Sequence, residues 1–151
     1  MGTNQIEYLI LKQVNISRRK QGLTTLRNSG GLRFIARRHS GKMALRGRIW
    51  HGQNVHMASK YVSSGFLESL FGLFIGLSSG YSGENVAMMP KGNVRGIGRI
   101  SSDKDVALAL HKTWMKSPGH RKNILDGRFN KIGIGVKRRG NMFYATQVFY
   151  G

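Results

Sequence analysis

Two histidines and one glutamate, in three separate segments, carry the side chains that a metal or hydrolytic site needs. His51 lies in Trp-His-Gly, Glu84 in Gly-Glu-Asn and His120 in Ser-Pro-Gly-His. Two neutral imidazoles can hold zinc at about 2.0–2.1 Å, and a nearby carboxylate can accept a proton from metal-bound water. Catalytic zinc usually has three protein ligands, so two histidines would hold it loosely. The alternative interpretation is structural, with Glu84 and the histidines hydrogen-bonded within a cleft, and we favour it over catalysis.

Other histidines and a serine have simpler interpretations. His39 lies on the apolar stripe of a predicted helix and is expected to be a core residue. His56 has no motif around it, and His111 is expected to be exposed. Ser117 lies close to His120, but adjacency in sequence is not the geometry of a catalytic triad. We therefore reject Ser117 as a nucleophile.

Three amide side chains lie in or near the same segments. Asn85 and Asn123 are expected to tie loops to backbone groups, since an amide both donates and accepts hydrogen bonds. Gln147, in the last predicted strand, is expected to reach the cleft with its side chain.

Periodicity and capping residues predict the elements that must position these groups. Asn4, with Glu7 three residues later, resembles a capping box for the first helix. Ser102 is expected to cap a later helix with Asp103 and Asp105 in its first turn. The other expected elements are a helix at 31–43, a strand at 85–89, a surface loop at 91–99, and a hairpin of strands at 131–137 and 142–150. Early helices and a late antiparallel hairpin indicate an α+β fold, with residues 1–151 in one domain.

The chain is strongly basic. It has 25 Lys and Arg against 6 Asp and Glu, a formal net charge of +19. The expected partners are polyanions, namely an anionic membrane or envelope polymers, unless the charge is only a solvated surface. No nucleic-acid module is recognisable and the cations are spread along the chain, so nucleic acid is expected to bind only non-specifically.

Three absences bear on location. The chain has no cysteine, which excludes a disulfide framework and a thiolate metal site. Its longest apolar stretch, Phe66 to Leu77, is too short to span a bilayer. No leader is visible at the start, so the chain is either cytoplasmic or a secreted protein from which the leader has been removed.

Five segments, in order along nearly the whole chain, resemble the CAP superfamily (cysteine-rich secretory proteins, antigen 5, pathogenesis-related 1) in its short prokaryotic form. They are His51-Gly52, Gly83–Ala87, Trp114–Leu125, Ile132–Val136 and Tyr144–Phe149. The resemblance implies an α-β-α sandwich, in which a small antiparallel sheet lies between helices and a central cleft carries the site.

The same resemblance implies which residues line that cleft. His51, Glu84 and His120 match family cleft residues and are expected to converge, with a divalent metal such as zinc held by His51 and His120. Ser117 stands where the family has a second acid, which predicts weak metal binding. His51 and Glu84 lie 33 positions apart, more than in compact members, so residues 66–82 are interpreted as an insertion.

The function implied by the resemblance is that of a secreted or extracellular binding module at a cell envelope, which binds lipid or a divalent metal and has no established catalysis. Two alternatives stay open: a metal-assisted hydrolase that uses the same three residues, and a polyanion-binding protein with a vestigial cleft. Phe66 to Leu77 is expected to form a partly exposed apolar lobe beside the cleft, which covers the core, joins a partner or meets lipid.

Overall fold

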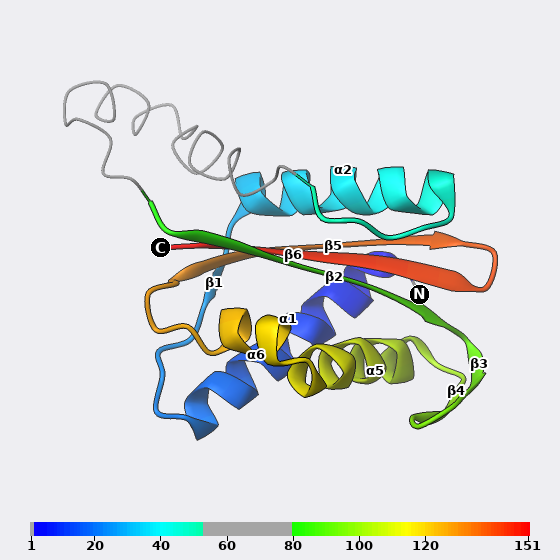
Figure 1. Ribbon diagram of the computed structural model, residues 1–151, viewed down its shortest axis with the longest axis horizontal. Coiled ribbons are helices and arrows are strands. Elements are labelled where there is room, and N and C mark those ends of the chain that lie inside the picture. Colours follow the sequence, from blue (N-terminus) through cyan, green and yellow to red (C-terminus); the bar gives the residue numbers. More distant parts are fainter. Residues whose placement is uncertain (1, 53–79) are drawn as a thin grey trace.

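A computed structural model describes residues 2–52 and 80–151 of the chain. In this part, one sheet lies between α2 on one side and α1, α5 and α6 on the other (Figure 1). The predicted α-β-α sandwich of the α+β class is therefore confirmed. The expectations for His56 and for the Phe66 to Leu77 lobe fall outside the described residues.

The helices and strands expected from the sequence are present in the expected order, and the short elements β1, β3, β4 and α6 were not predicted. In chain order, the elements are α1 (Thr3–Lys20), β1 (Arg27–Asn28), α2 (Gly30–Arg46), β2 (Ser82–Pro90), β3 (Gly92–Val94), β4 (Gly98–Ile100), α5 (Asp103–Lys116), α6 (Pro118–Ile124), β5 (Lys131–Arg139) and β6 (Met142–Tyr150). No helix in the described ranges has both the length and the apolar character needed to cross a bilayer.

The main sheet has the strand order β1-β5-β6-β2, so β2 lies at one edge. The β5–β6 and β2–β6 pairs are antiparallel, and the short β1 pairs with β5 in parallel. Residues 91–99 are not only a loop as expected, because β3 and β4 pair there in a two-stranded ribbon. Glycines at 92, 96 and 98 have positive φ angles. They interrupt the alternation of apolar and polar residues from which a strand is predicted.

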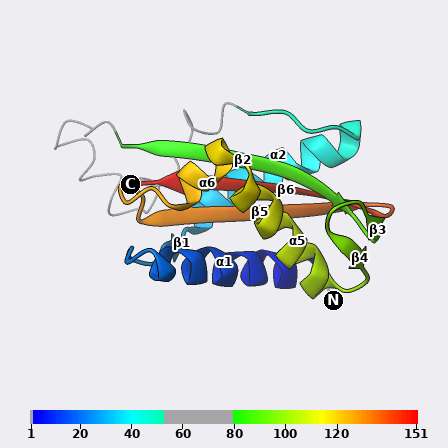
Figure 2. The same cartoon turned by 60° about the horizontal axis from the view of Figure 1, so that its bottom comes forward.

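Large apolar side chains fill the space between the sheet and α1, α5 and α6. Alternate residues of β5 and β6 point to this side, where α1 and α5 pack against each other; in Figure 2, α1 lies below the strands and α5 runs in front of them. Trp114 of α5 is fully buried, and its indole Nε1 donates to the Val86 carbonyl at 3.2 Å. Burial of each large apolar side chain stabilises the fold by about 1.5–3 kcal/mol, so this layer forms the main core.

On the opposite side, α2 packs directly against the backbone of β5. A Cβ atom placed on Gly133 would lie 2.1 Å from the carbonyl carbon of Leu32, and one on Gly135 would lie 2.2 Å from that of Ala36. Ser40 of α2 donates to the Gly135 carbonyl at 2.8 Å. Glycine is required at these strand positions because any side chain would push the helix away.

The two predicted capping boxes have different outcomes. Ser102 and Asp105 form a reciprocal capping box at the start of α5, as predicted. The box predicted for Asn4 and Glu7 is wrong, because Gly2 precedes α1 and gives no side-chain cap. Glu7 is instead buried against the sheet, where it accepts a hydrogen bond from the backbone N–H of Val136 at 3.0 Å and pairs with an arginine of α2. An unpaired N–H of β5 in the interior needs an acceptor, and Glu7 provides it.

The two helical histidines also differ from each other in outcome. His39 is buried, as expected, and its Nε2 lies 2.7 Å from the Trp50 carbonyl oxygen. The prediction that His111 is exposed is wrong: α1 covers it, and its Nε2 lies 2.8 Å from the hydroxyl of Ser17. Burial lowers the pKa of His111 from 6.5 to about 4.

Candidate functional site

His51, Glu84 and His120 come together at the β2 edge of the sheet. Glu84 lies near the start of β2, His120 lies in α6, and His51 lies in the segment that follows α2. Gly47 ends α2 with φ +68°, in the left-handed conformation that favours glycine, and the chain then returns towards β2. We refer to these three residues as the His51–Glu84–His120 cluster.

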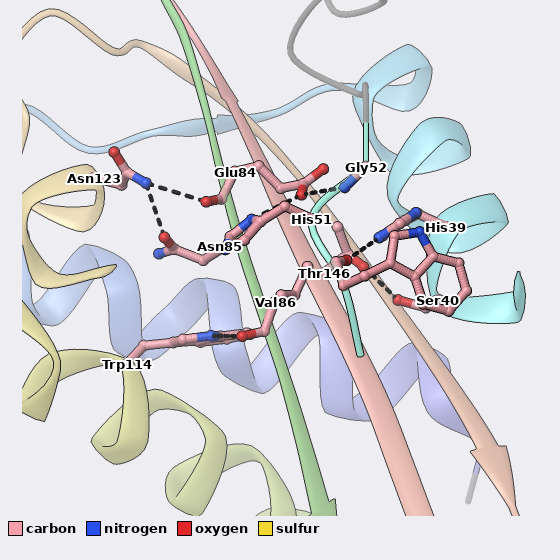
Figure 3. Close-up of polar contacts among 11 residues, drawn as sticks. His39, Ser40, His51, Gly52, Glu84, Asn85, Val86, Trp114, Asn123 and Thr146 are labelled. Carbon is pink, nitrogen blue, oxygen red and sulfur yellow. Dashed lines mark hydrogen bonds and ion pairs between the residues drawn. The ribbon is translucent and has the colours of Figure 1, made fainter. Parts of the chain in front are cut away.

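The Glu84 carboxylate ties the His51 segment to the sheet. Its Oε1 accepts hydrogen bonds from His51 Nδ1 at 3.1 Å and from the Gly52 backbone N–H at 2.9 Å (Figure 3). The Glu84 side chain is 4% exposed, whereas that of His51 is 63% exposed. A buried carboxylate therefore orients a histidine ring that faces solvent.

His120 lies beside His51, with 6.3 Å between the ring centroids and 36° between the ring planes. Its Nδ1 is buried and has no hydrogen-bond partner among the described residues. Burial lowers the pKa of His120, and the charge of His51 lowers it further. His120 is therefore neutral at neutral pH, which is the form of imidazole that binds a metal.

A buried amide network lies next to the cluster and fixes the position of α6. Asn85 Nδ2 donates to the His120 carbonyl at 3.1 Å and to Gln147 Oε1 at 3.0 Å. Asn123 Nδ2 donates to Asn85 Oδ1 at 2.9 Å and to the Glu84 carbonyl at 3.2 Å. Asn85 and Asn123 thus tie neighbouring segments together, as the sequence predicts.

Gln147 and Ser117 make no hydrogen bond to the ring nitrogens of the cluster. Gln147 is fully buried beneath Asn85, and its Nε2 has no partner among the described residues. Ser117 lies between α5 and α6, where its backbone carbonyl accepts from the N–H of Arg121 at 2.8 Å. The structure therefore places Ser117 at a helix junction, and Asn85 links Gln147 to the backbone of His120 by hydrogen bonds.

His39 and Trp50 also support the cluster, a link that inspection of single motifs misses. Besides the hydrogen bond to the Trp50 carbonyl, the His39 ring meets the Trp50 indole edge-on at 5.3 Å between centroids. Trp50 directly precedes His51, so a buried histidine of α2 anchors the segment that carries the exposed one. The sequence feature that could have indicated this link is the combination of a core histidine, His39, with a tryptophan that directly precedes a second histidine.

The two imidazoles of the cluster are the side chains that could contact a divalent metal. His51 Nδ1 is engaged by Glu84, which leaves Nε2 as the ligand atom, and metal-binding histidines commonly bond a carboxylate in this way through the second ring nitrogen. His120 supplies a second imidazole, whose unpartnered Nδ1 is buried. Within residues 2–52 and 80–151, no three His, Asp or Glu side chains are grouped so that they could hold a metal together.

Comparison with known families identifies the domain. The family model of CAP, the cysteine-rich secretory protein family, matches residues 11–150. The chain belongs to the CAP family. It does so without any cysteine, so no disulfide bond stabilises this CAP domain.

Similar proteins come from several bacteria. The CAP domain is 30% identical over 145 residues to the Bacillus subtilis protein YkwD, and the match covers 96% of this chain and 47% of YkwD. The chain thus spans about half the length of that relative. An extracellular protein with an SCP domain from Bacillus anthracis is 25% identical, with a TM-score of 0.61 over 97% of this chain and 40% of that one. An outer surface protein from Borrelia burgdorferi has a TM-score of 0.68 at 16% identity, over 99% of this chain and 95% of its own.

Proposed function

We propose that this CAP domain is an extracellular binding module that acts at a cell envelope, with the His51–Glu84–His120 cluster as its ligand site. The similar Bacillus anthracis protein is described as extracellular, which supports this location. The net charge of +19 supports attraction to anionic membranes and envelope polymers.

The arrangement of Glu84 is the observation that favours a binding role over a catalytic one. In a hydrolase of this type the carboxylate must accept a proton from the attacking water. The carboxylate of Glu84 is almost fully buried, and its Oε1 already accepts from His51 and from the backbone of Gly52. Glu84 is therefore suited to orient the His51 ring rather than to exchange protons with a substrate.

A divalent metal is the ligand that the two histidines suit. His51 Nε2 and a ring nitrogen of His120 would hold it, and water would complete the coordination. The solved structure of NaASP2 with Zn²⁺ shares the fold, with a TM-score of 0.52 and 12% identity, and it makes zinc the first ion to test. Two imidazole ligands give modest affinity, which falls on acidification because protons compete for the same nitrogens.

Zinc titration calorimetry tests this site. We expect the wild type to bind zinc, and we expect His51→Ala and His120→Ala each to weaken binding at least about ten-fold, as the loss of one of two ligands requires. Ser117→Ala is the matched control, since its hydroxyl makes no hydrogen bond with the described residues, and it should bind like the wild type. Zinc binding that both histidine variants retain would refute the cluster as the site.

A further inference from the structure

We propose that one end of α2, together with the neighbouring end of β5, docks on an anionic phospholipid bilayer. This basic face consists of Leu45, Arg46, Arg48, Ile49, Lys137 and Arg139. The C-terminal end of α2 lies beside the β5–β6 hairpin (Figure 1), and Arg139 joins them by donating to the Ala44 and Leu45 carbonyls at 3.1 and 3.0 Å. The inference rests on the proposed location at a cell envelope, but not on the His51–Glu84–His120 cluster.

The arginines of the basic face are held in place by neutral groups. Arg139 donates to helix carbonyls, and the guanidinium carbons of Arg46 and Arg48 lie 5.4 and 5.6 Å from the centre of the Trp50 ring. Carbonyls and aromatic rings order a guanidinium without cancelling its charge. The face therefore keeps a positive charge that an anionic surface can neutralise.

The acidic side chains of the described residues are engaged elsewhere. Glu7, Glu84, Asp103 and Asp126 form ion pairs with Arg37, His51, Lys91 and Arg128, and Asp105 caps α5. By contrast, the cations of the basic face form no ion pair with any described acid. This face is therefore one of the places where positive charge is not compensated by an ion pair.

Exposed apolar side chains favour a bilayer over a soluble polyanion. Leu45 is 79% exposed and lines an open groove of about 370 Å³ with Gly41, Ala44 and residues 137–139. Ile49 is also exposed. A soluble polyanion would pair with the arginines but would leave Leu45 in water, whereas a bilayer can accept both kinds of side chain.

Co-sedimentation of the full chain with vesicles tests the proposal. The vesicles contain equal parts of phosphatidylcholine and phosphatidylglycerol, and dextran sulfate serves as the soluble polyanion. Each cation near an anionic surface strengthens binding about five-fold, so Arg46→Gln/Arg48→Gln should weaken vesicle binding about 25-fold. The matched control, Lys104→Gln/Lys112→Gln, removes two exposed charges from α5 and should weaken it no more than about two-fold. Circular dichroism confirms that each variant is folded.

Leu45→Ser separates the two kinds of anionic partner. We expect it to weaken vesicle binding several-fold and to leave dextran sulfate binding unchanged, because only a bilayer takes up the leucine. Equal losses in both double variants would overturn the proposal in favour of diffuse charge. No effect of Leu45→Ser on vesicles would overturn it in favour of a soluble polyanion. If the wild type does not bind these vesicles at low salt, the docking surface is wrong, while zinc binding at the cluster is judged independently.

Discussion

The sheet face that carries α1, α5 and α6 is filled with large apolar side chains, whereas the face under α2 brings a helix onto glycine backbone. The first face contains Trp114, Phe129, Phe143 and Phe149 in one continuous core. The second has two small clusters, one around Leu32 and one around Met43. Stability therefore comes from side-chain volume on one side and from close backbone approach on the other.

The candidate site lies where these two kinds of packing meet. Both sides supply the candidate site, since His51 follows α2 and His120 lies in α6, but the contacts that orient His51 are polar. His39, Trp50 and Glu84 hold it through hydrogen bonds and one ring contact. The segment has an apolar contact where Trp50 packs on the small Met43 cluster, and regions with few buried apolar contacts are the ones that open locally. We expect the backbone amides of the His51 segment to be less protected from hydrogen exchange than those of the core around Trp114.

The largest expected effect is on the apolar face. Trp114→Ala removes a fully buried side chain and leaves the Val86 carbonyl without its indole donor. We expect it to reduce the free energy of unfolding by about 4 kcal/mol, as is usual when a large core side chain is lost. Urea denaturation followed by circular dichroism measures this. A loss below about 1 kcal/mol would show that α5 is not part of the main core.

On the α2 face, stability depends on the close approach of the helix to the strand backbone rather than on the volume of buried side chains. Gly135→Ala would bring a methyl group within 2.2 Å of the Ala36 carbonyl carbon, so we expect a loss of about 3 kcal/mol. Gly119→Ala is the control, because a Cβ atom there meets nothing within 4 Å, and in a helix the change should be neutral or stabilising. The same denaturation experiment applies. Equal stability of the two variants would contradict the close packing of α2 on β5.

A smaller effect, dependent on pH, is expected from His111. Burial keeps this ring neutral in the folded state, with its pKa lowered from 6.5 to about 4, while the unfolded chain takes up the proton at the higher value. The unfolded state thus binds more protons between these values, so stability falls as the pH drops from about 6.5 to about 4, by about 2–3 kcal/mol, and shows no further loss from His111 below that. His111→Gln should flatten this part of the profile. An unchanged slope in the variant would mean that His111 does not titrate in this window.

Local signals in the sequence were sufficient where a single element decides the outcome. Ser102 and Asp105 cap α5 within one turn, and the alternation over 131–137 and 142–150 predicts β5 and β6. Predictions from local signals were wrong where a residue contacts an element that is distant in the sequence. Glu7 lies at a plausible capping position, but its carboxylate accepts a hydrogen bond from the N–H of Val136, 129 positions away. The exposure of His111 likewise depends on where α1 packs, which no local pattern contains.

The candidate site could be named from the sequence only through its resemblance to a family. Nothing in the spacing of 33 positions between His51 and Glu84 requires them to meet, yet Glu84 Oε1 lies 3.1 Å from the His51 ring. The support for that contact was not predicted. The link from His39 to Trp50 and the link from Gln147 through Asn85 to His120 join four elements, and such networks follow from the fold rather than from any one segment.

The central claim, that His51 and His120 form one ligand site, is tested most directly by following the histidine ring signals in NMR spectra during a zinc titration of the full chain. We expect the ring signals of His51 and His120 to shift together as zinc is added, while those of His39 and His111 stay in place, because both of the latter rings are buried and already hydrogen-bonded. Lowering the pH through about 6 should reverse the shifts as protons displace the metal. Zinc binding that leaves the signals of His51 and His120 unchanged would contradict the claim.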